Sequence, residues 1–389
     1  MMKLPPLALY VHVPWCVRKC PYCDFNSHGI DRSRELPERA YLAALLADLE
    51  EELTRIIPRE LVSIFIGGGT PSLMSSDFYR HLLKGVDERL ELAPDCEITI
   101  EANPGTLEQG RFGGYRDAGI NRLSLGVQSF QPEQLKALGR IHDGEQAYNA
   151  VNSARSAGFD NLNLDLMHGL PQQDVALALA DIEQALALTP EHLSWYQLTL
   201  EPNTEFYSHP PSLPGDEVLW DIQDAGHERL ERAGLLRYEI SAYARQERRS
   251  RHNLNYWQFG DYMGIGAGAH GKLSRWSENG GLIVERYWKS RQPASYLRRH
   301  HDPRGFLAGS QRVATSALPL EFAMNALRLV NGVSLQQWPR TSGRPVEELE
   351  NKLVQAREKG LLINDPLRLK ASPKGLLFLN DLLASISDS

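Results

Sequence analysis

Six short apolar segments recur along the first half of this chain, and each is followed by a longer segment or an unusual loop. The short segments are rich in Val, Ile, Leu and aromatic residues, as strands buried in a parallel sheet are. Pro37–Ile57 has helical periodicity, because its leucines recur along one face and a proline stands at its start. A strand followed by a helix, repeated about six times, predicts an α/β fold built as a parallel barrel or a doubly wound sheet. The six segments are Leu7–Val13, Val62–Ile66, Glu97–Ile100, Arg122–Leu125, Leu162–Leu166 and His192–Leu198.

Three cysteines follow the first predicted strand at the spacing C-x3-C-x2-C, at Cys16, Cys20 and Cys23. Three thiolates from one short loop fill three corners of a cubane 4Fe–4S cluster and leave one iron open for a small molecule. Zinc is the alternative, because thiolates also suit zinc. A structural zinc site needs a fourth ligand, which would have to be His12 or His28.

The composition limits the number of domains and the class of protein that this chain can form. The chain has 389 residues, which suffices for one large domain and a small one, and 42% of them are hydrophobic. The net charge of -7 disfavours broad nucleic-acid binding, and no apolar run is long enough to predict a membrane span or a secretion signal. Four cysteines in a chain of this length do not indicate a disulfide framework, so a cytoplasmic protein is expected. The fourth cysteine, Cys96, is expected to be a small buried hydrophobic residue.

Unusual polar or glycine-rich loops follow all six predicted strands. In a parallel barrel the loops after the strands share one face, where active sites are built. We therefore expect these loops to form one site. Glycines in the second loop let backbone groups approach a ligand closely. The loops begin with the cysteines and continue with Gly67–Pro71, Glu101–Gly105, Gly126–Ser129, Asp165–Pro171 and Thr199–Asn203.

The cysteine loop, the Gly-Gly-Gly-Thr-Pro turn and the Gly-Val-Gln-Ser-Phe segment resemble the radical S-adenosylmethionine superfamily, and within it the anaerobic coproporphyrinogen III oxidase-like family. The resemblance implies a partial (β/α)6 TIM-like barrel. It also implies that the three cysteines hold a 4Fe–4S cluster, and that S-adenosylmethionine chelates the fourth iron through its amino and carboxylate groups. By the same resemblance, the residues that bind S-adenosylmethionine are Tyr10, Gly68, Gly69, Thr70, Glu101, Gln128, Arg140 and Asp165.

Three features resemble the haem chaperones of this family more than its oxidases. Phe25 stands where the oxidases have a further cysteine, and only nine residues precede Tyr10. The segment His252–Trp257 matches the chaperones' HNxxYW motif. Imidazole suits a haem iron, and aromatic walls suit its macrocycle. The haem-binding residues implied are His252, Asn253, Tyr256 and Trp257.

This resemblance implies a chaperone that binds haem and passes it to haem-dependent respiratory proteins at the membrane surface, rather than an enzyme. No catalytic residue is assigned. The alternative function is oxygen-independent coproporphyrinogen III oxidase, by radical decarboxylation. A nicotinamide oxidoreductase would rest only on Gly266–Gly271, which matches G-x-G-x-x-G but is followed by an expected hairpin over Lys272–Gly281. Arg248, Arg249 and Arg251 are candidates for haem propionates, with a solvated basic loop as the alternative.

The rest of the chain is expected to form a small winged-helix-like α+β domain. Helices are predicted over Glu321–Val330, Pro345–Lys359 and Pro373–Ile386, with a hairpin over Leu361–Ala371. From Glu321 onward there are 9 Lys and Arg against 8 Asp and Glu, so no basic face for DNA is expected. The predicted organisation is a core barrel over 1–240, a haem-motif segment and connector over 241–305, which includes a solvated His300–His301 pair, and the C-terminal domain over 306–389.

Overall fold

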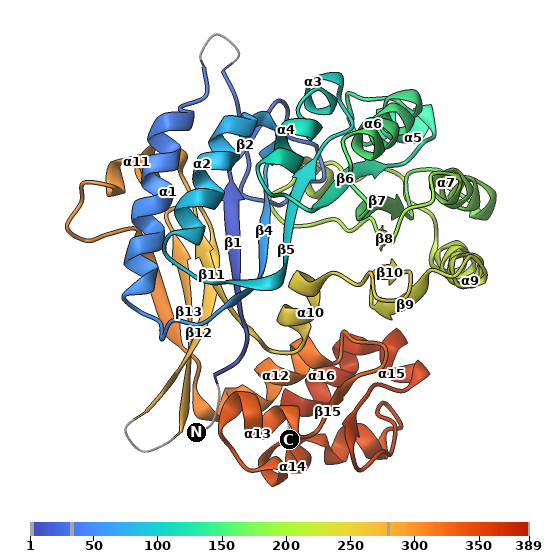
Figure 1. Cartoon of the computed structure of the whole chain (residues 1–389). Coiled ribbons are helices and arrows are strands. Elements are labelled where there is room, and N and C mark those ends of the chain that lie inside the picture. The colour runs from blue at the N-terminus through green and yellow to red at the C-terminus, as the bar shows by residue number, and fades with distance from the viewer. Residues whose placement is uncertain (1–3, 32–34, 278–280, 388–389) are drawn as a thin grey trace.

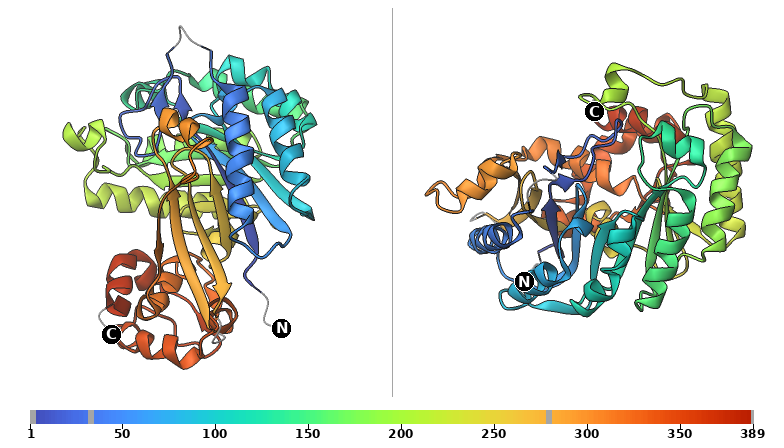
Figure 2. Two further views of the ribbon diagram at one scale, coloured as in Figure 1. Left: turned by 90° about the vertical axis from the view of Figure 1, so that its left-hand side faces the viewer. Right: turned by 90° about the horizontal axis from the view of Figure 1, so that it is seen from above.

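Six parallel strands stand side by side in the order β1, β4, β5, β6, β7 and β8, as the alternating pattern predicts. The computed structural model describes residues 4–31, 35–277 and 281–387. The sheet curves into an open barrel whose carboxyl ends lie at the top of Figure 1, and Figure 2 (right) looks down on that end. The α/β class and the partial barrel are thereby confirmed. The strands are β1 (Leu7–Val13), β4 (Leu61–Gly68), β5 (Leu92–Ala102), β6 (Arg122–Gln128), β7 (Leu162–His168) and β8 (His192–Gln197).

Helices cover the outer face of this sheet (Figure 2, right). The helix predicted over Pro37–Ile57 is present as α1, with Leu45 and Leu49 buried against the strands. The helices are α1 (Glu38–Leu53), α2 (Ser76–Asp87), α3 (Thr106–Gln109), α4 (Phe112–Asp117), α5 (Pro132–Ala137), α6 (Gly144–Ser156), α7 (Val175–Ala187), α8 (Glu205–Ser208) and α9 (Asp216–Arg232), with a 3-10 turn at Pro71–Leu73.

The sheet continues beyond the six strands on both sides. Next to β1 it runs through a parallel β11 and the antiparallel β12, β13 and β14, and next to β8 it runs through β10 and β9. The sheet therefore does not end at residue 240, and β12 and β13 reach down to the C-terminal domain (Figure 2, left). These strands are β9 (Leu236–Glu239), β10 (Ala242–Ala244), β11 (Asp261–Ile265), β12 (His270–Trp276), β13 (Leu282–Lys289) and β14 (Leu307–Arg312), followed by a 3-10 turn at Thr315–Ala317.

The glycine motif Gly266–Gly271 lies in the connection between β11 and β12 and in the start of β12. A dinucleotide fingerprint needs a helix after its glycines, whereas here an antiparallel strand follows. The structure therefore gives no support to the nicotinamide hypothesis. The hairpin expected after the motif is confirmed by β12 and β13, although its turn at 278–280 lies outside the described residues.

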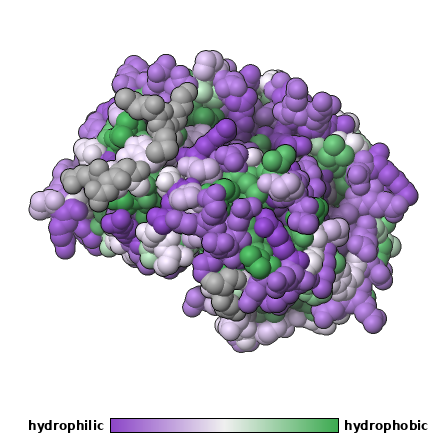
Figure 3. All heavy atoms as spheres, turned by 90° about the horizontal axis from the view of Figure 1, so that it is seen from below, coloured by the Kyte–Doolittle hydropathy of each residue, from purple (hydrophilic) through white to green (hydrophobic). Residues whose placement is uncertain are grey.

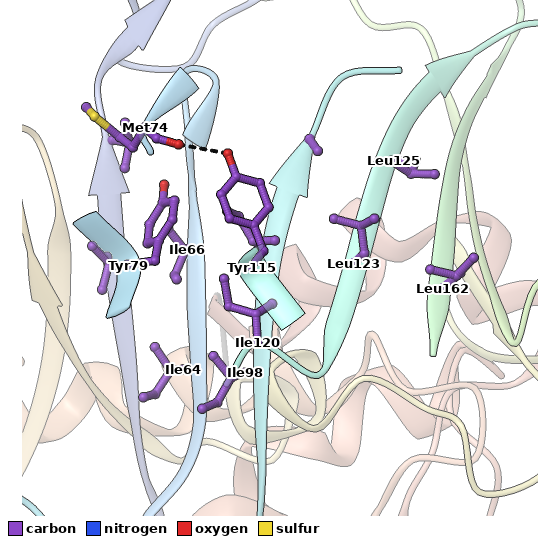
Figure 4. Packing of buried hydrophobic residues seen from close by; sticks show 14 of the residues in the cluster. Ile64, Ile66, Met74, Tyr79, Ile98, Tyr115, Ile120, Leu123, Leu125 and Leu162 are labelled. Carbon is purple, nitrogen blue, oxygen red and sulfur yellow. Dashed lines mark hydrogen bonds between the residues drawn. The ribbon is translucent and has the colours of Figure 1, made fainter. Parts of the chain in front are cut away.

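Aliphatic side chains from neighbouring strands form the barrel core together with aromatic rings from the helices. Ile66 and Leu123 are fully buried in it, and Figure 4 shows how side chains from successive strands meet. The hydroxyl of Tyr115 donates a hydrogen bond to the carbonyl of Met74 at 2.8 Å, which satisfies the one polar atom of that buried ring. Cys96 is buried in this core as expected, and burial raises the pKa of its thiol to about 12.

The C-terminal domain packs its own hydrophobic cluster below the barrel (Figure 1), around the fully buried ring of Trp338. The predicted hairpin over Leu361–Ala371 is reduced to a single bridge between Leu362 and Ala371, and β16 pairs with β15 instead. Seen from below, hydrophilic residues predominate and apolar ones form small separate areas (Figure 3). The remaining elements are α10 (Arg251–Trp257), α11 (Pro293–Arg299), α12 (Leu318–Ala326), β15 (Val333–Ser334), α13 (Gln337–Ser342), α14 (Val346–Glu358), β16 (Arg368–Leu369), α15 (Pro373–Leu377) and α16 (Leu379–Ser387).

None of the helices in the described part of the chain is both long and apolar enough to cross a membrane.

Candidate functional site

The cysteine loop follows β1 at the carboxyl end of the barrel. The short strand β2 (Trp15–Cys16) pairs with β3 (His28–Gly29), which fixes the two ends of the loop. Cys16 is buried, whereas Cys20 and Cys23 are half-buried. All three line one cavity of about 350 Å³, so the sequence spacing does deliver three sulfurs to one place.

Hydrogen-bond donors lie beside each of these sulfurs. The Thr70 hydroxyl donates to Cys16 Sγ at 3.5 Å, and Arg140 Nη1 donates to Cys20 Sγ at 3.6 Å. Cys23 Sγ lies 3.8 Å from the hydroxyl of Ser27. Burial raises the pKa of the Cys16 and Cys23 thiols, so a cation that displaces their protons is needed to hold them as thiolates. The surrounding donors then stabilise the sulfur charge, as they do around iron–sulfur clusters.

The two histidines considered as a fourth zinc ligand are already engaged. His12 Nδ1 lies 3.0 Å from the Tyr10 hydroxyl and its Nε2 lies 2.9 Å from the Asn26 carbonyl, while His28 Nε2 lies 3.2 Å from the Arg291 carbonyl. Across the described ranges, no group of three or more His, Cys, Asp or Glu side chains is placed to hold a single metal ion. In a cubane cluster each thiolate binds a different iron, so its ligands need not converge on one point. The donor set therefore fits a cluster better than zinc.

The cavity brings together most of the candidate residues predicted from the sequence. It extends from the cysteine loop to α10 and the C-terminal domain, so that both ends of the predicted site share one space. Tyr10, His252 and Tyr256 do not line it. The candidates that do line it are Cys16, Cys20, Cys23, Gly68, Gly69, Thr70, Glu101, Gln128, Arg140, Asp165, Asn253 and Trp257.

Glu101 is one of the acidic residues that line the wall of the cavity. Its Oε2 accepts a hydrogen bond from the backbone nitrogen of Gly68 at 3.2 Å. Burial, and secondarily the nearby Asp165, raises the pKa of Glu101 to about 8. Asp165 is held by the Ser124 hydroxyl at 2.9 Å and the Asn163 amide at 2.8 Å. Because Asp165 helps to raise the pKa of Glu101, the pair favours a cationic ligand. A positive charge beside the two carboxyl groups restores the ionised form of Glu101.

Arg140 is the basic group of the same wall. Its Nη2 donates to Asn103 Oδ1 at 2.8 Å and to the Gly126 carbonyl at 2.7 Å, which aims the guanidinium across the cavity. Gln128 has a φ of 69°, in the left-handed region, and its Oε1 accepts from the Tyr196 hydroxyl at 2.7 Å. Such backbone strain costs on the order of 1 kcal/mol and is found at functional sites.

Several cavity residues were not singled out from the sequence. Asn103 lies in the loop Glu101–Gly105, which the sequence pattern marked, so its closeness to Glu101 in the sequence could have identified it as a site residue. Tyr196 lies near the end of β8, where the strand-end rule would also have found it. Arg18, Tyr22, Pro71 and Ala102 also lie in loops that the sequence pattern marked, whereas no local pattern pointed to the remaining residues. The missed lining residues are Arg18, Tyr22, Pro71, Ala102, Asn103, Ser124, Ser194, Tyr196, Glu239, Ser241 and Arg328.

The HNxxYW motif forms the short helix α10. The ring of His252 is only 4% exposed, stacks on Phe65 with 5.0 Å between ring centroids, and has Nδ1 3.0 Å from the Ser63 hydroxyl. Burial lowers the pKa of His252 to about 3, so the imidazole is neutral. Its Nε2 has no hydrogen-bond partner among the described residues. Tyr256 lies behind it, whereas Asn253 and Trp257 reach the cavity.

Comparison with known proteins identifies the family. The sequence matches the Radical SAM superfamily over residues 10–182 and the HemN C-terminal domain over residues 316–378. It is 48% identical to the heme chaperone HemW of Escherichia coli and 46% identical to that of Haemophilus influenzae, and each comparison covers 98% of both chains. The chain belongs to the HemW family. The solved structure of coproporphyrinogen III oxidase (HemN) from Escherichia coli has the same fold, with a TM-score of 0.80 at 21% identity over 98% of this chain and 90% of that chain.

Membership of the HemW family, on a radical SAM core, agrees with the donor set of the cavity. Cys16, Cys20 and Cys23 would hold the 4Fe–4S cluster, and Glu101 and Arg140 offer opposite charges to the ammonium and carboxylate groups of S-adenosylmethionine. When bound, this pair supplies one-electron cleavage of the sulfonium. The protein's own contribution is to orient both groups and keep water out.

Proposed function

We propose that this protein is a haem chaperone, which binds haem at the end of the cavity next to α10 and passes it to haem-dependent respiratory proteins. The observation that carries this proposal is the similarity to proteins named as heme chaperones, at 46–48% identity over 98% of the chain. It is supported by the position of the HNxxYW motif, which puts Asn253 and Trp257 into the cavity that the cysteines line.

The two ends of the cavity take different ligands in this proposal. The cysteine end takes the cluster and S-adenosylmethionine, and the α10 end takes haem against the indole of Trp257. For His252 to ligate the haem iron, its ring has to leave the stack with Phe65, because its exposed fraction in this structure is only 4%. Haem ligation by His252 therefore includes a rearrangement of α10.

The acceptors and the location are part of the same proposal. We place the protein in the cytoplasm, where cysteine thiols are kept reduced and can bind a cluster, and we place its acceptors at the membrane surface. The proposed organisation is the core barrel over 1–240, the haem-motif segment and connector over 241–305, and the C-terminal domain over 306–389, although the sheet itself is continuous across both boundaries.

The test is an anaerobic haem titration of the cluster-loaded protein, followed by the Soret band. We expect saturable binding of one haem per chain. The His252→Ala variant is expected to show a shifted Soret band or weaker binding if the imidazole reaches the iron. His81→Ala is the matched control, because His81 stands exposed on α2, away from the cavity.

Non-saturable binding to the wild-type chain contradicts the chaperone proposal. In that case coproporphyrinogen III is assayed as a substrate under the same anaerobic conditions, since the fold is shared with the oxidase. If haem binds saturably and His252→Ala has no effect, the chaperone proposal stands and the role of His252 as an iron ligand is wrong.

A further inference from the structure

Arg328, from the C-terminal domain, lines the same cavity as the cysteines of the barrel. It follows α12, where the chain returns to the sheet. Leu329 forms an antiparallel bridge with Glu239, and the Val330 nitrogen donates to the Tyr238 carbonyl at 3.1 Å. These backbone contacts fix the position of Arg328 against β9, so its place in the cavity does not depend on side-chain packing alone.

The polar atoms around Arg328 are poorly satisfied. Its Nε, the Nε1 of Trp257 and the Oε2 of Glu239 are buried and have no hydrogen-bond partner within the described residues. The guanidinium lies over the indole of Trp257, 4.4 Å from the ring centroid, and Nη2 is 3.5 Å from Glu239 Oε2. An ion pair of this length, with two N–H groups unused beside it, leaves donors free for a ligand.

The arginines that the sequence offered for haem propionates are occupied elsewhere. Arg251 pairs with Asp95 at 2.5 Å, and Arg248 lies 3.6 Å from Asp160. Neither they nor Arg249 line the cavity. Of the other arginines that line the cavity, Arg18 belongs to the cysteine loop and Arg140 is engaged at the cysteine end. Arg328 is therefore the arginine best placed at the α10 end.

We propose that Arg328 and the indole N–H of Trp257 form a carboxylate-binding subsite that takes a propionate of a tetrapyrrole. The inference rests on the haem-chaperone proposal for the identity of the ligand. Arg328 would exchange its long contact with Glu239 for a paired contact with the propionate, and the indole face would pack on the macrocycle.

The carboxyl group of Glu239 lies beside Arg328 and lines the same cavity. Burial raises the pKa of Glu239, although Arg328 acts in the opposite direction. A raised pKa makes it easier for Glu239 to take up a proton when a second carboxylate approaches. One consequence is that the C-terminal domain supplies part of the ligand site, so that haem binding couples the two domains.

The test compares haem with haem dimethyl ester, in which both propionates are blocked, in the same co-solvent and with the cluster-loaded full chain. We expect the wild-type chain to bind the ester about 10- to 100-fold more weakly than haem, as the loss of a charge-assisted pair implies. Arg328→Met is expected to bind both ligands with similar, weak affinity. Arg344→Met is the matched control, because both arginine side chains are 32% exposed and lie near a glutamate of the same chain.

Two further variants separate recognition from a structural role. Arg328→Lys keeps the charge and is expected to retain part of the preference for haem. Glu239→Gln releases Arg328 from its pair and is expected to bind haem more tightly, which a merely structural pair would not do. Equal binding of haem and ester by the wild-type chain overturns the subsite and leaves the chaperone proposal intact. Failure of the wild-type chain to bind haem saturably contradicts the chaperone proposal itself and, with it, the identity of this ligand.

Discussion

The carboxyl group of Glu101 makes a quantitative prediction about S-adenosylmethionine binding. With a pKa of about 8, this group is protonated in the free site at pH 7. A sulfonium or ammonium beside it requires the ionised form, so the proton must leave when the ligand binds. Ionising it at pH 7 costs about 1.4 kcal/mol, because one pKa unit corresponds to that energy.

The direction in which affinity for S-adenosylmethionine changes with pH follows from this ionisation. Below pH 8 affinity is expected to rise about tenfold per pH unit, and above pH 8 it should level off, because the carboxyl is then already ionised. At pH 7 roughly 0.9 proton per ligand should be released by this group. Isothermal titration calorimetry in buffers of different ionisation enthalpy, with the cluster-loaded protein under anaerobic conditions, measures that number.

The control is Glu101→Gln, which preserves the shape of the side chain and cannot release a proton. The ligand's own amino group titrates equally in both proteins, so the difference between them isolates Glu101. Asp165→Asn should move the pH at which affinity levels off to a lower value, because Asp165 contributes to the raised pKa. Identical proton release by the wild-type chain and Glu101→Gln would refute the reasoning.

Three other variants, one of them with a matched control, test the site and the core. Cys20→Ser should lose iron and the visible charge-transfer absorbance of the cluster, whereas Cys96→Ser should keep both, and retention of colour by the first would contradict the ligand assignment. Gly68→Ala should lower the free energy of unfolding by about 2 kcal/mol. The reason is that Gly68 has a φ of 117° and that a Cβ would lie 2.7 Å from the His12 ring. An unchanged midpoint of urea unfolding would contradict this expected strain. Ile66→Ala should cost about 2–5 kcal/mol in the same assay, since the side chain is fully buried, and a cost below about 1 kcal/mol would mean that the core closes over the gap.

Most of the barrel could be predicted from the sequence because its signals are local. Leu7–Val13 is a strand with the bounds expected, since an apolar run between turn residues can bury both faces only inside a parallel sheet. The convergence of the loops was also predictable, because parallel strands end at one face. The spacing of Cys16, Cys20 and Cys23 places all three in one loop in any fold that leaves the loop intact.

Other features of the structure could not be predicted from local sequence patterns. The sequence marked no helix at the HNxxYW motif, but the seven residues Arg251–Trp257 form one and bury the ring of His252 under β4 and β1. Nothing in a hydropathy pattern distinguishes a motif histidine that faces a cavity from one that stacks on Phe65. The glycine motif at Gly266–Gly271 was ambiguous for the same reason, because only the pairing of β12 with β11 and β13 excludes a helix after these glycines.

By itself, the sequence determined the succession of strands and helices, the loop with three thiols and the family to which the chain belongs. These properties depend on residues that lie close together in the chain, so their periodicity and spacing can be read from the sequence. Only the tertiary structure decided that Glu101 lies close enough to Asp165 to raise its pKa, and that Arg328 reaches the cavity from the C-terminal domain. Such contacts join residues far apart in the chain, and they exist only once the sheet has curved and the two domains have packed together.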